Sequence, residues 1–587
     1  MTILAELSDV LGARFAAAGL EPALGAARWA DRPDLAQFQC NGALAAAKAA
    51  GENPRALAER IAAALRDNPI FADVSIAGPG FINLTLSDEA LSARVQRIAD
   101  DPRCGGWASA DPEKIVMDYG GPNIAKPLHV GHLRSAIIGE SLKRILRFAG
   151  DTVIGDAHLG DWGLPMGQLI TELKREQPSL VYFDPSHEGP FPAEAPIDFA
   201  DLERLYPLAS AACKADPERA AEARAATAEL QRGRAGYRAL WRHFIALSRA
   251  AVERDYADLG VAFDLWKGES DADPLIPAMA EALRAKGLVE ESDGAQIVRV
   301  AREGDAKEIP PLILFKSDGS VLYGTTDLAT IVDRVNTDNP DRMIYVVDQR
   351  QSLHFEQVFR ASDLAGIFPA DRLEHIRFGT MNGKDGKPFK TREGGVLKLR
   401  DLIDMVTERA QARLAESGLA QDYGEAETQA VARKVGVAAL KFADLSNQRT
   451  TDYVFDLDRF MAFEGKTGPY LLYASVRVRS VLARAEAMSG APAGPVAIAE
   501  REERDLGLAL TAFGDVAREA YDKRMPHLLC DHAFQLAQTF SKFYAARRIA
   551  DEPDAAARAS RLSLARATGA QLDLILSLLG IDAPARM

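Results

Sequence analysis

The sequence predicts a multidomain α/β protein, in which a mainly parallel sheet follows a small N-terminal α+β domain and precedes an all-α C-terminal region. The chain has 587 residues, 47% of them hydrophobic, enough for several domains of roughly 100 to 200 residues with their own cores. Strand-like runs alternate with helical patterns from residue 114 onward, as in a parallel sheet. From about residue 430 the pattern is almost wholly helical.

Each region has its own signal. Residues up to about 90 combine alanine-rich helical segments with FADVSIAGPGFINLTLS, whose alternating apolar positions around Gly-Pro-Gly predict a β-hairpin. The strand-like runs of the sheet region are KIVMDY, TVIGDA, AQIVRVA, PLILFKS and MIYVVDQ. Residues 171–235, rich in Ala, Glu, Pro and Arg, are predicted to be an insertion. The predicted domains are residues 1–105, 106–400, a helical connection over 401–464, and 465–587.

Composition narrows the class of protein. The N-terminus lacks the basic and apolar segments of a signal peptide, and no run approaches the roughly 20 apolar residues of a membrane span. The four cysteines are far apart and form no CxxC pair, so we expect no zinc site and a reducing, cytoplasmic location. The net charge of −14 argues only weakly against a nucleic-acid partner, because a basic face can lie on an acidic protein.

The most specific motif lies where a predicted strand gives way to a helix. KIVMDY is followed by GGPNIAKP, which cannot be helical, and then by HVGHLRSAIIGESLKRILRFAG, which has apolar residues at helical spacing. His129 and His132 therefore lie at the carboxyl edge of a parallel sheet, where such sheets bind ligands. We expect the free N–H groups of the helix N-terminus to bind phosphate, Gly131 to let a nucleotide approach, and both histidines to donate to phosphoryl oxygens.

Taken alone, the HxGH pattern is equally compatible with ordinary histidines at a helix start. The surrounding strand, turn and helix, together with Lys126, favour a nucleotide site.

At this point PNIAKPLHVGH is similar to the histidine signature of class I aminoacyl-tRNA synthetases, and in this extended form it resembles the arginyl-tRNA synthetase family. Further segments resemble that family in the same order along nearly the whole chain, the insertion excepted. They are HLGDWG (158–163), LYGTTD (322–327), DQRQSLHFEQVF (348–359), GKDGKPFKTREGG (383–395), TGPYLLYA (467–474) and LLGIDAPARM (578–587).

The resemblance implies a Rossmann-type catalytic domain, an N-terminal domain that contacts tRNA and a C-terminal anticodon-binding bundle. It implies ATP-dependent formation of arginyl-adenylate with release of pyrophosphate, then transfer to the terminal ribose of tRNA(Arg). ATP with Mg²⁺, L-arginine and tRNA(Arg) are the expected ligands, and a monomer is expected. Two alternatives are a nucleotidylyltransferase, which would not need TGPYLLYA or LYGTTD, and a non-catalytic tRNA-binding paralogue, which would be expected to lose the histidines or Lys126.

The chain departs from the family at two places. The second class I signature is present only as Pro388, Phe389, Lys390 and Thr391 and lacks its final lysine. The resemblance implies that Lys126 supplies the missing charge to the triphosphate and that Lys390 assists. Pro165 stands where glutamine is common, which puts any role of that side chain in doubt.

A pocket for arginine should offer carboxylates and an aromatic face to the planar guanidinium. The resemblance implies that Asp118, Tyr323 and Asp327 surround the guanidinium and that Asn123 and Gln351 hold the α-amino and carboxylate groups. From spacing alone, Tyr323 and Asp327 share a helical face, which is equally what a packed helix would show.

The tRNA-binding candidates lie in the terminal regions. Tyr470, Tyr473 and Arg477 fall at helical spacing and would present aromatic and cationic groups to anticodon bases, although half-buried positions in a helix bundle explain them equally well. Met587 is implied beside the anticodon by the resemblance alone. In the N-terminal domain Phe38, Gln39 and Asn41 are candidates, with inward packing of the phenylalanine as the alternative.

Overall fold

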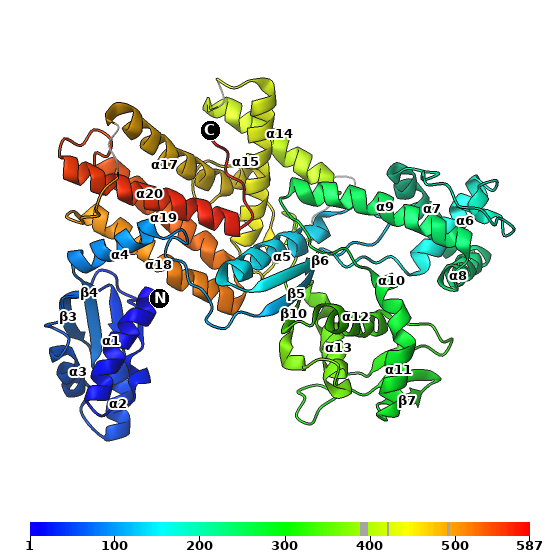
Figure 1. Cartoon of the computed structure of the whole chain (residues 1–587), viewed down its shortest axis with the longest axis horizontal. Helices are drawn as coiled ribbons and strands as arrows, with labels where there is room; N and C mark the ends of the chain where they lie inside the picture. Colours follow the sequence, from blue (N-terminus) through cyan, green and yellow to red (C-terminus); the bar gives the residue numbers. More distant parts are fainter. Residues whose placement is uncertain (388–396, 420–421, 490–492) are drawn as a thin grey trace. The chain divides into compact units, whose positions relative to one another are not determined.

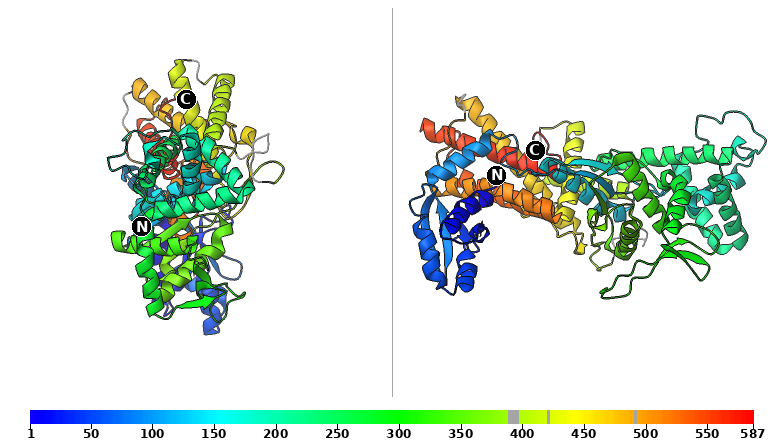
Figure 2. Two further views of the ribbon diagram at one scale, coloured as in Figure 1. Left: turned by 90° about the vertical axis from the view of Figure 1, so that its right-hand side faces the viewer. Right: turned by 60° about the horizontal axis from the view of Figure 1, so that its bottom comes forward.

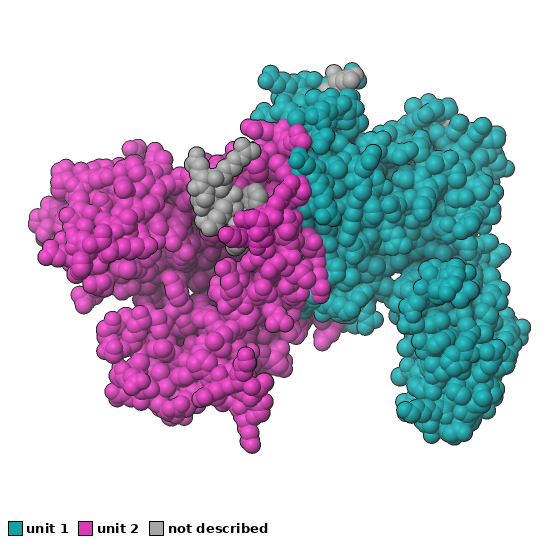
Figure 3. Space-filling model, turned by 180° about the vertical axis from the view of Figure 1, so that it is seen from behind, with its two compact units in different colours: residues 1–110, 410–446, 458–587 teal, residues 111–409, 447–457 magenta. Residues whose placement is uncertain are grey.

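The computed structural model describes residues 1–387, 397–419, 422–489 and 493–587. The chain divides into two compact units, shown in different colours in Figure 3. One contains residues 1–110, 410–446 and 458–587, and the other contains residues 111–409 and 447–457. The histidine motif belongs to the second unit.

A parallel sheet is the centre of the second unit and confirms the predicted fold class. Its strands are β5 (Lys114–Tyr119), β6 (Thr152–Asp156), β10 (Arg342–Val346) and β11 (Leu373–His375), in the order β11-β10-β5-β6. All three pairings are parallel. The central strand β5 buries Ile115, Val116 and Met117 in succession, the continuous apolar run expected of a strand covered on both faces.

The order of these strands creates a ligand-binding edge. Strand β5 lies between β6, which follows it through helix α5 (Val130–Ala149), and β10, which comes much later in the chain. The sheet therefore reverses its strand order beside β5, and such switch points open a crevice at the carboxyl ends of the strands. Ser135 of α5 links the carboxyl ends of β5 and β10, because its Oγ accepts from Gly120 N (2.8 Å) and donates to Val346 O (2.6 Å).

Two helices on the β10 side complete this part of the unit. They are α12 (Tyr323–Asp338) and α13 (Ser352–Ala365), and their apolar residues pack in one core with Val116, Met343 and Tyr345 of the sheet. The short strands β12 (Met381–Asn382) and β13 (Tyr453–Val454) pair in parallel with each other.

Two runs predicted for the parallel sheet lie elsewhere, so that part of the prediction was wrong. AQIVRVA and PLILFKS form β8 (Ala295–Val298) and β9 (Leu312–Phe315), which pair antiparallel with each other, while β7 (Val289–Ser292) pairs antiparallel with β8. No helix lies between β8 and β9, so the crossover that a parallel connection requires is missing. Helices α10 (Glu269–Ala272) and α11 (Ile276–Ala285) precede this small sheet.

The predicted insertion is helical. It contains the end of α6 (Leu164–Glu176), α7 (Phe199–Ala215) and α8 (Pro217–Gln231). With α9 (Ala235–Asp258), which follows the insertion, these helices gather into one group within the second unit, as Figures 1 and 2 show. Helix α7 begins with a capping box between Asp198 and Asp201 and buries Leu202, Leu205 and Ala209 at helical spacing.

The first unit contains the N-terminal α+β fold. An antiparallel sheet of order β1-β2-β4-β3 includes the predicted hairpin as β3 (Phe71–Ala77) and β4 (Phe81–Leu86). Its other elements are β1 (Ala27–Trp29), β2 (Phe38–Cys40), α1 (Ile3–Ala17), α2 (Gly42–Ala50), α3 (Pro54–Ala63) and α4 (Asp88–Asp100).

Apart from the short strand β13, the regular elements described in the C-terminal part are helices, and those from residue 457 onward are all helical, as predicted. Helix α14 (Leu399–Ser417) leads from the second unit into the first, and the helices that follow are α15 (Glu425–Leu445), α16 (Leu457–Phe460), α17 (Gly468–Ser489), α18 (Arg501–Lys523), α19 (His527–Ala546) and α20 (Ala555–Leu578). Within the described ranges, no helix combines the length and apolar character needed to cross a membrane.

Candidate active site

The turn between β5 and α5 is held in a conformation that few side chains adopt. Ala125 has a φ of +63°, in the left-handed region, and is buried with its backbone N–H donated to Ser248 Oγ (3.0 Å). Gly120, also left-handed at +68°, has its carbonyl bound by the Tyr256 hydroxyl. Both partners come from α9, so the helix after the insertion fixes the turn that precedes the histidines.

The two histidines are held in the same way at the start of α5, each by a backbone N–H bound to its Nδ1. His129 is the N-cap of α5, and its Nδ1 accepts from Gly131 N (3.0 Å), while His132 Nδ1 accepts from His129 N (3.1 Å). The ring centroids are 4.0 Å apart. A neutral imidazole that accepts at Nδ1 carries its proton on Nε2, so each ring keeps one Nε2–H donor.

Burial supports this neutral state. It lowers the pKa of His132 to about 3, with the charges of His129 and Lys126 as further causes. Burial and then the Lys126 charge also lower the pKa of His129. The pair therefore donates hydrogen bonds at neutral pH without adding positive charge.

The backbone of this helix start differs from the sequence expectation. The N–H of Val130 donates to Leu397 O (3.1 Å), and that of His132 donates to His129 O (2.8 Å), so these first amides already have protein partners. Gly131 also has a local reason to be glycine, because a Cβ there would lie 2.7 Å from the His129 ring. The side-chain donors thus gain importance for binding an anion here.

Lysine groups were also predicted near this turn. The Lys126 ammonium lies over the ring of Tyr206, 4.7 Å from its centroid. Lys390 lies outside the described residues. The segment after it is placed, however: Lys398 pairs with His129 in an antiparallel bridge, and Leu399 N donates to Leu128 O (2.8 Å).

The residues predicted for the amino acid begin two helices of the same edge. Tyr323 is the first residue of α12 and is 71% exposed, and Asp327 follows one turn later. The Asp327 carboxylate is 2.5 Å from Nε2 of His354 on α13. Gln351 ends a short 3₁₀ turn before α13 and is exposed. Asn123 is exposed in the turn, where its neighbour Ile124 N donates to Gly160 O (3.1 Å).

Asp118 has a partner inside the chain. Arg334 of α12, only 1% exposed, donates to Asp118 Oδ2 (2.7 Å) and to Asp156 Oδ2 (2.8 Å). Burial raises the pKa of Asp118 although Arg334 opposes it. For Asp156, burial is outweighed by the neighbouring His158 and Arg334, which hold its pKa below the usual range. An internal guanidinium thus binds the carboxyl ends of β5 and β6 together.

A further carboxyl, Glu269, belongs to this region and was missed. It begins α10, and its pKa is raised to about 7, first by burial and then by the Asp161 charge, with a further contribution from Asp327. Asp161 is held by Ser270, whose Oγ donates to Oδ2 (2.6 Å). The only local signal was a glycine and glutamate at a helix start, in WKGES, which does not distinguish a site from a cap.

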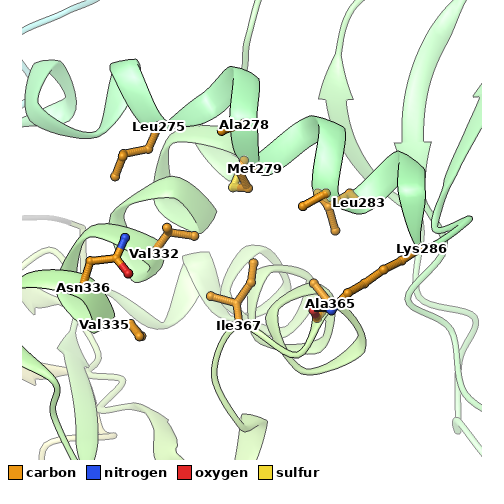
Figure 4. Close-up of a pocket in the computed structure, with 11 residues that line it drawn as sticks. Leu275, Ala278, Met279, Leu283, Lys286, Val332, Val335, Asn336, Ala365 and Ile367 are labelled. Carbon is orange, nitrogen blue, oxygen red and sulfur yellow. Dashed lines mark hydrogen bonds between the residues drawn. The ribbon is translucent and has the colours of Figure 1, made fainter.

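One apolar cavity of about 380 Å³ lies between α11, α12 and the end of α13 (Figure 4). It is lined mainly by aliphatic side chains, among them Leu275, Met279 and Ile367, with Lys286 at its edge. None of the residues predicted to bind ATP or arginine lines it, so the candidate site is the polar edge of the sheet and not this cavity.

Comparison with known proteins shows the family of the chain. The family model for the catalytic domain of class I tRNA synthetases (R) matches residues 94–457, that for the DALR anticodon binding domain matches 471–587, and that for the arginyl tRNA synthetase N-terminal domain matches 3–86. The arginine–tRNA ligases of Hyphomonas neptunium and Maricaulis maris are 58% and 56% identical, with all of each chain covered. The chain belongs to the arginyl-tRNA synthetase family.

Solved arginyl-tRNA synthetases share the fold. Those of Plasmodium falciparum and Thermus thermophilus match all of this chain and all of their own, with TM-scores of 0.82 and 0.80 at 24% and 23% identity. The three-part fold class predicted from the sequence is thereby confirmed.

The residues predicted to bind the anticodon contact other side chains of the C-terminal helical bundle. Tyr470 packs edge-on against Phe534, with centroids 5.5 Å apart, and the Arg477 guanidinium lies over the Tyr544 ring at 4.8 Å. Tyr473 and Met587 are partly buried. Tyr470, Tyr473 and Arg477 share α17, and the choice between base contact and bundle packing stays a prediction.

Of the three tRNA-binding candidates in the N-terminal domain, the phenylalanine packs inward, as the alternative interpretation of the sequence predicted. Phe38 is fully buried against Trp29, with centroids 4.5 Å apart. Gln39 donates from Nε2 to Asn83 Oδ1 (3.0 Å), and Asn41 is the N-cap of α2.

Proposed function

We propose that this edge of the sheet is where the chain ligates L-arginine to tRNA(Arg) with ATP. An oxygen of the arginine carboxylate attacks the α-phosphorus, and pyrophosphate leaves to give arginyl-adenylate. The terminal ribose hydroxyl of the tRNA then attacks the arginyl carbonyl and AMP leaves. No covalent bond to the protein is needed, so positioning and electrostatic stabilisation do the catalytic work.

The observation that carries this proposal is the division of the edge into two electrostatic halves. Two neutral imidazole donors and Lys126 lie at the start of α5, while Asp327, Glu269 and exposed Tyr323 lie at the starts of α12 and α10. Cationic and neutral donors suit a triphosphate, and carboxylates suit a guanidinium. ATP and arginine together need both halves.

On the ATP side, His129 and His132 donate from Nε2 to phosphate oxygens, and Lys126 adds a full positive charge. Gly131 keeps the His129 ring in place and leaves the nucleotide room. Lys390 is proposed to assist from the second signature. Mg²⁺ accompanies ATP and is held by phosphate oxygens and water, as is usual for this ion.

On the arginine side, Asp327 and Glu269 receive the guanidinium beside the Tyr323 ring, and Asn123 and Gln351 hold the α-amino and carboxylate groups. Asp118 was predicted to contact the guanidinium directly. Since it is paired with Arg334, we propose that it forms the base of the pocket and that Asp327 makes the closer contact.

The remaining assignments concern the tRNA and the cell. The N-terminal domain contacts tRNA, and α17 contributes Tyr470, Tyr473 and Arg477, with Met587, to the anticodon site. The proposed domains are residues 1–105, 106–400 with the insertion over 171–235, 401–464 and 465–587. We propose a cytoplasmic monomer.

Lys126→Ala tests the ATP half of the proposal. ATP–pyrophosphate exchange with arginine and tRNA(Arg) should fall by about 100-fold or more, because the triphosphate loses one preorganised charge. Lys174→Ala, an exposed lysine of α6, is the matched control and should exchange normally. An active Lys126→Ala enzyme would remove the triphosphate assignment. Recovery after adding Thr391→Lys would support the idea that Lys126 replaces the missing signature lysine.

A further inference from the structure

The insertion is built into the nucleotide turn. Leu202 and Leu205 of α7 belong to the same buried cluster as Ile124 and Ala125, the two residues before Lys126. All four of these residues are buried, with at most 1% of their surface exposed. Because a close-packed core transmits displacement, helix α7 and the turn hold each other in place.

Two other side chains of α7 contact the two segments that meet at the histidine turn, one before it and one paired with it. Glu203 and Tyr206 are three residues apart and share a helix face. The Tyr206 ring lies under the Lys126 ammonium, 4.7 Å from centroid to Nζ. Glu203 Oε2 accepts from Lys398 Nζ (3.0 Å), and Lys398 is the residue bridged to His129. One helix of the insertion therefore contacts both segments that meet at the ATP half.

Tyr206 is also near the arginine half. The pKa of Tyr323 is raised first by burial, then by the Glu269 charge and then by Tyr206. Tyr206 thus contacts Lys126 directly and is close enough to Tyr323 to influence its pKa.

We propose that Tyr206 is a positioning residue for arginine activation, whose ring holds Lys126 toward the triphosphate without neutralising its charge. This rests on the proposed role of Lys126. A lysine side chain has four rotatable methylenes and loses much conformational freedom when it is fixed. A carboxylate could fix it, but would compete with the phosphates for the ammonium. An aromatic face attracts the cation while leaving its full charge and its N–H donors available to ATP.

The expected effect follows from the strength of this contact. A cation–π pair at a partly buried position corresponds to about a 2- to 30-fold change in an equilibrium or rate constant. Tyr206→Leu should therefore lower kcat/KM for ATP by about 2- to 30-fold in pyrophosphate exchange, measured at saturating arginine and tRNA. The KM for arginine should stay nearly unchanged. Tyr206→Phe, which keeps the ring, should exchange like the native protein.

Two comparisons separate positioning from stability. Leu208→Ala changes a 51% exposed residue of the same helix and should alter neither exchange nor the melting temperature. In a Lys126→Ala background, Tyr206→Leu should add little further loss, because the group that it positions is gone. If Tyr206→Leu fails to fold, Tyr206→Gln supplies a side chain without an aromatic face and is expected to show the same ATP-specific loss.

The outcomes distinguish this inference from the function on which it rests. Full exchange by folded Tyr206→Leu, an equal loss in Tyr206→Phe, or an undiminished loss in the Lys126→Ala background would each overturn the role of the ring. Normal exchange by Lys126→Ala alone would instead remove the proposed triphosphate site. A loss confined to ATP, rescued by Phe and dependent on Lys126, supports both.

Discussion

Replacing the buried Arg334 by methionine should lower the free energy of unfolding of the catalytic unit strongly, because Arg334 pairs with two buried carboxylates. The guanidinium is 1% exposed and pairs with Asp118 at 2.7 Å and Asp156 at 2.8 Å, on two different strands. Methionine fills most of the space of the aliphatic stem but leaves two buried carboxylates without their cation. Removing one partner of a buried ion pair costs about 3 to 5 kcal/mol of unfolding free energy, a large part of a typical total of roughly 5 to 15 kcal/mol.

The loss should also depend on pH in a defined direction. In the native protein the pKa of Asp156 is held low, so its stabilising contribution is present above the unfolded pKa of about 3.9 and is lost only as the pH falls through the folded value. In the variant, burial is no longer opposed by Arg334 and the pKa of both carboxyls rises. Protonation then relieves the unpaired charges, so the stability difference should narrow between about pH 8 and about pH 5.

Urea unfolding at both pH values, with hydrogen exchange to locate the change in β5 and β6, measures this effect. The matched control is Arg350→Met, since Arg350 is 77% exposed and its pair with Asp348 should be worth at most about 1 kcal/mol. A difference below about 1 kcal/mol for Arg334→Met, or one that stays constant with pH, would refute the reasoning.

Three further predictions concern the reaction and the tRNA. His129→Ala or His132→Ala should slow adenylate formation by about 100- to 1000-fold while changing arginine affinity much less. Because burial lowers the pKa of both rings, and that of His132 to about 3, the native rate should show no histidine titration above about pH 7, which single-turnover rates check. Asp327→Asn should weaken arginine binding by about 2 to 5 kcal/mol but affect neutral citrulline less, and calorimetry that found equal losses would indicate misfolding. Tyr473→Ala or Arg477→Ala should narrow the discrimination between cognate and anticodon-altered tRNA, because base stacking is worth roughly 1 to 3 kcal/mol; a lower melting temperature with unchanged discrimination would assign these side chains to the bundle core.

The parts of the fold that the sequence predicted are those set by local pattern. The β3–β4 hairpin, the all-helical C-terminal region and the turn between β5 and α5 follow from periodicity and from glycine and proline positions. The misassigned strands show the limit of this reasoning. AQIVRVA and PLILFKS are apolar runs, and such runs carry no information on pairing direction; only the missing helix between them indicated an antiparallel pair.

The candidate site divides in the same way. His129, His132 and Lys126 lie within seven consecutive residues, so a motif could reveal them. Arg334, Glu269 and Tyr206 act through partners far away in sequence: Arg334 and Asp118 are separated by 216 positions. Their roles depend on which elements the fold brings together, and a buried arginine or a tyrosine on a helix has no distinguishing local pattern.

The most direct measurement of the central claim is ATP–pyrophosphate exchange with each amino acid in turn, with and without tRNA(Arg). The account predicts exchange with arginine alone among the amino acids, dependent on His129 and Lys126. We also expect the activation step to require tRNA(Arg), so that exchange is much slower without it. Exchange driven by another amino acid, or arginine exchange that survives loss of His129 and Lys126 together, would contradict the account.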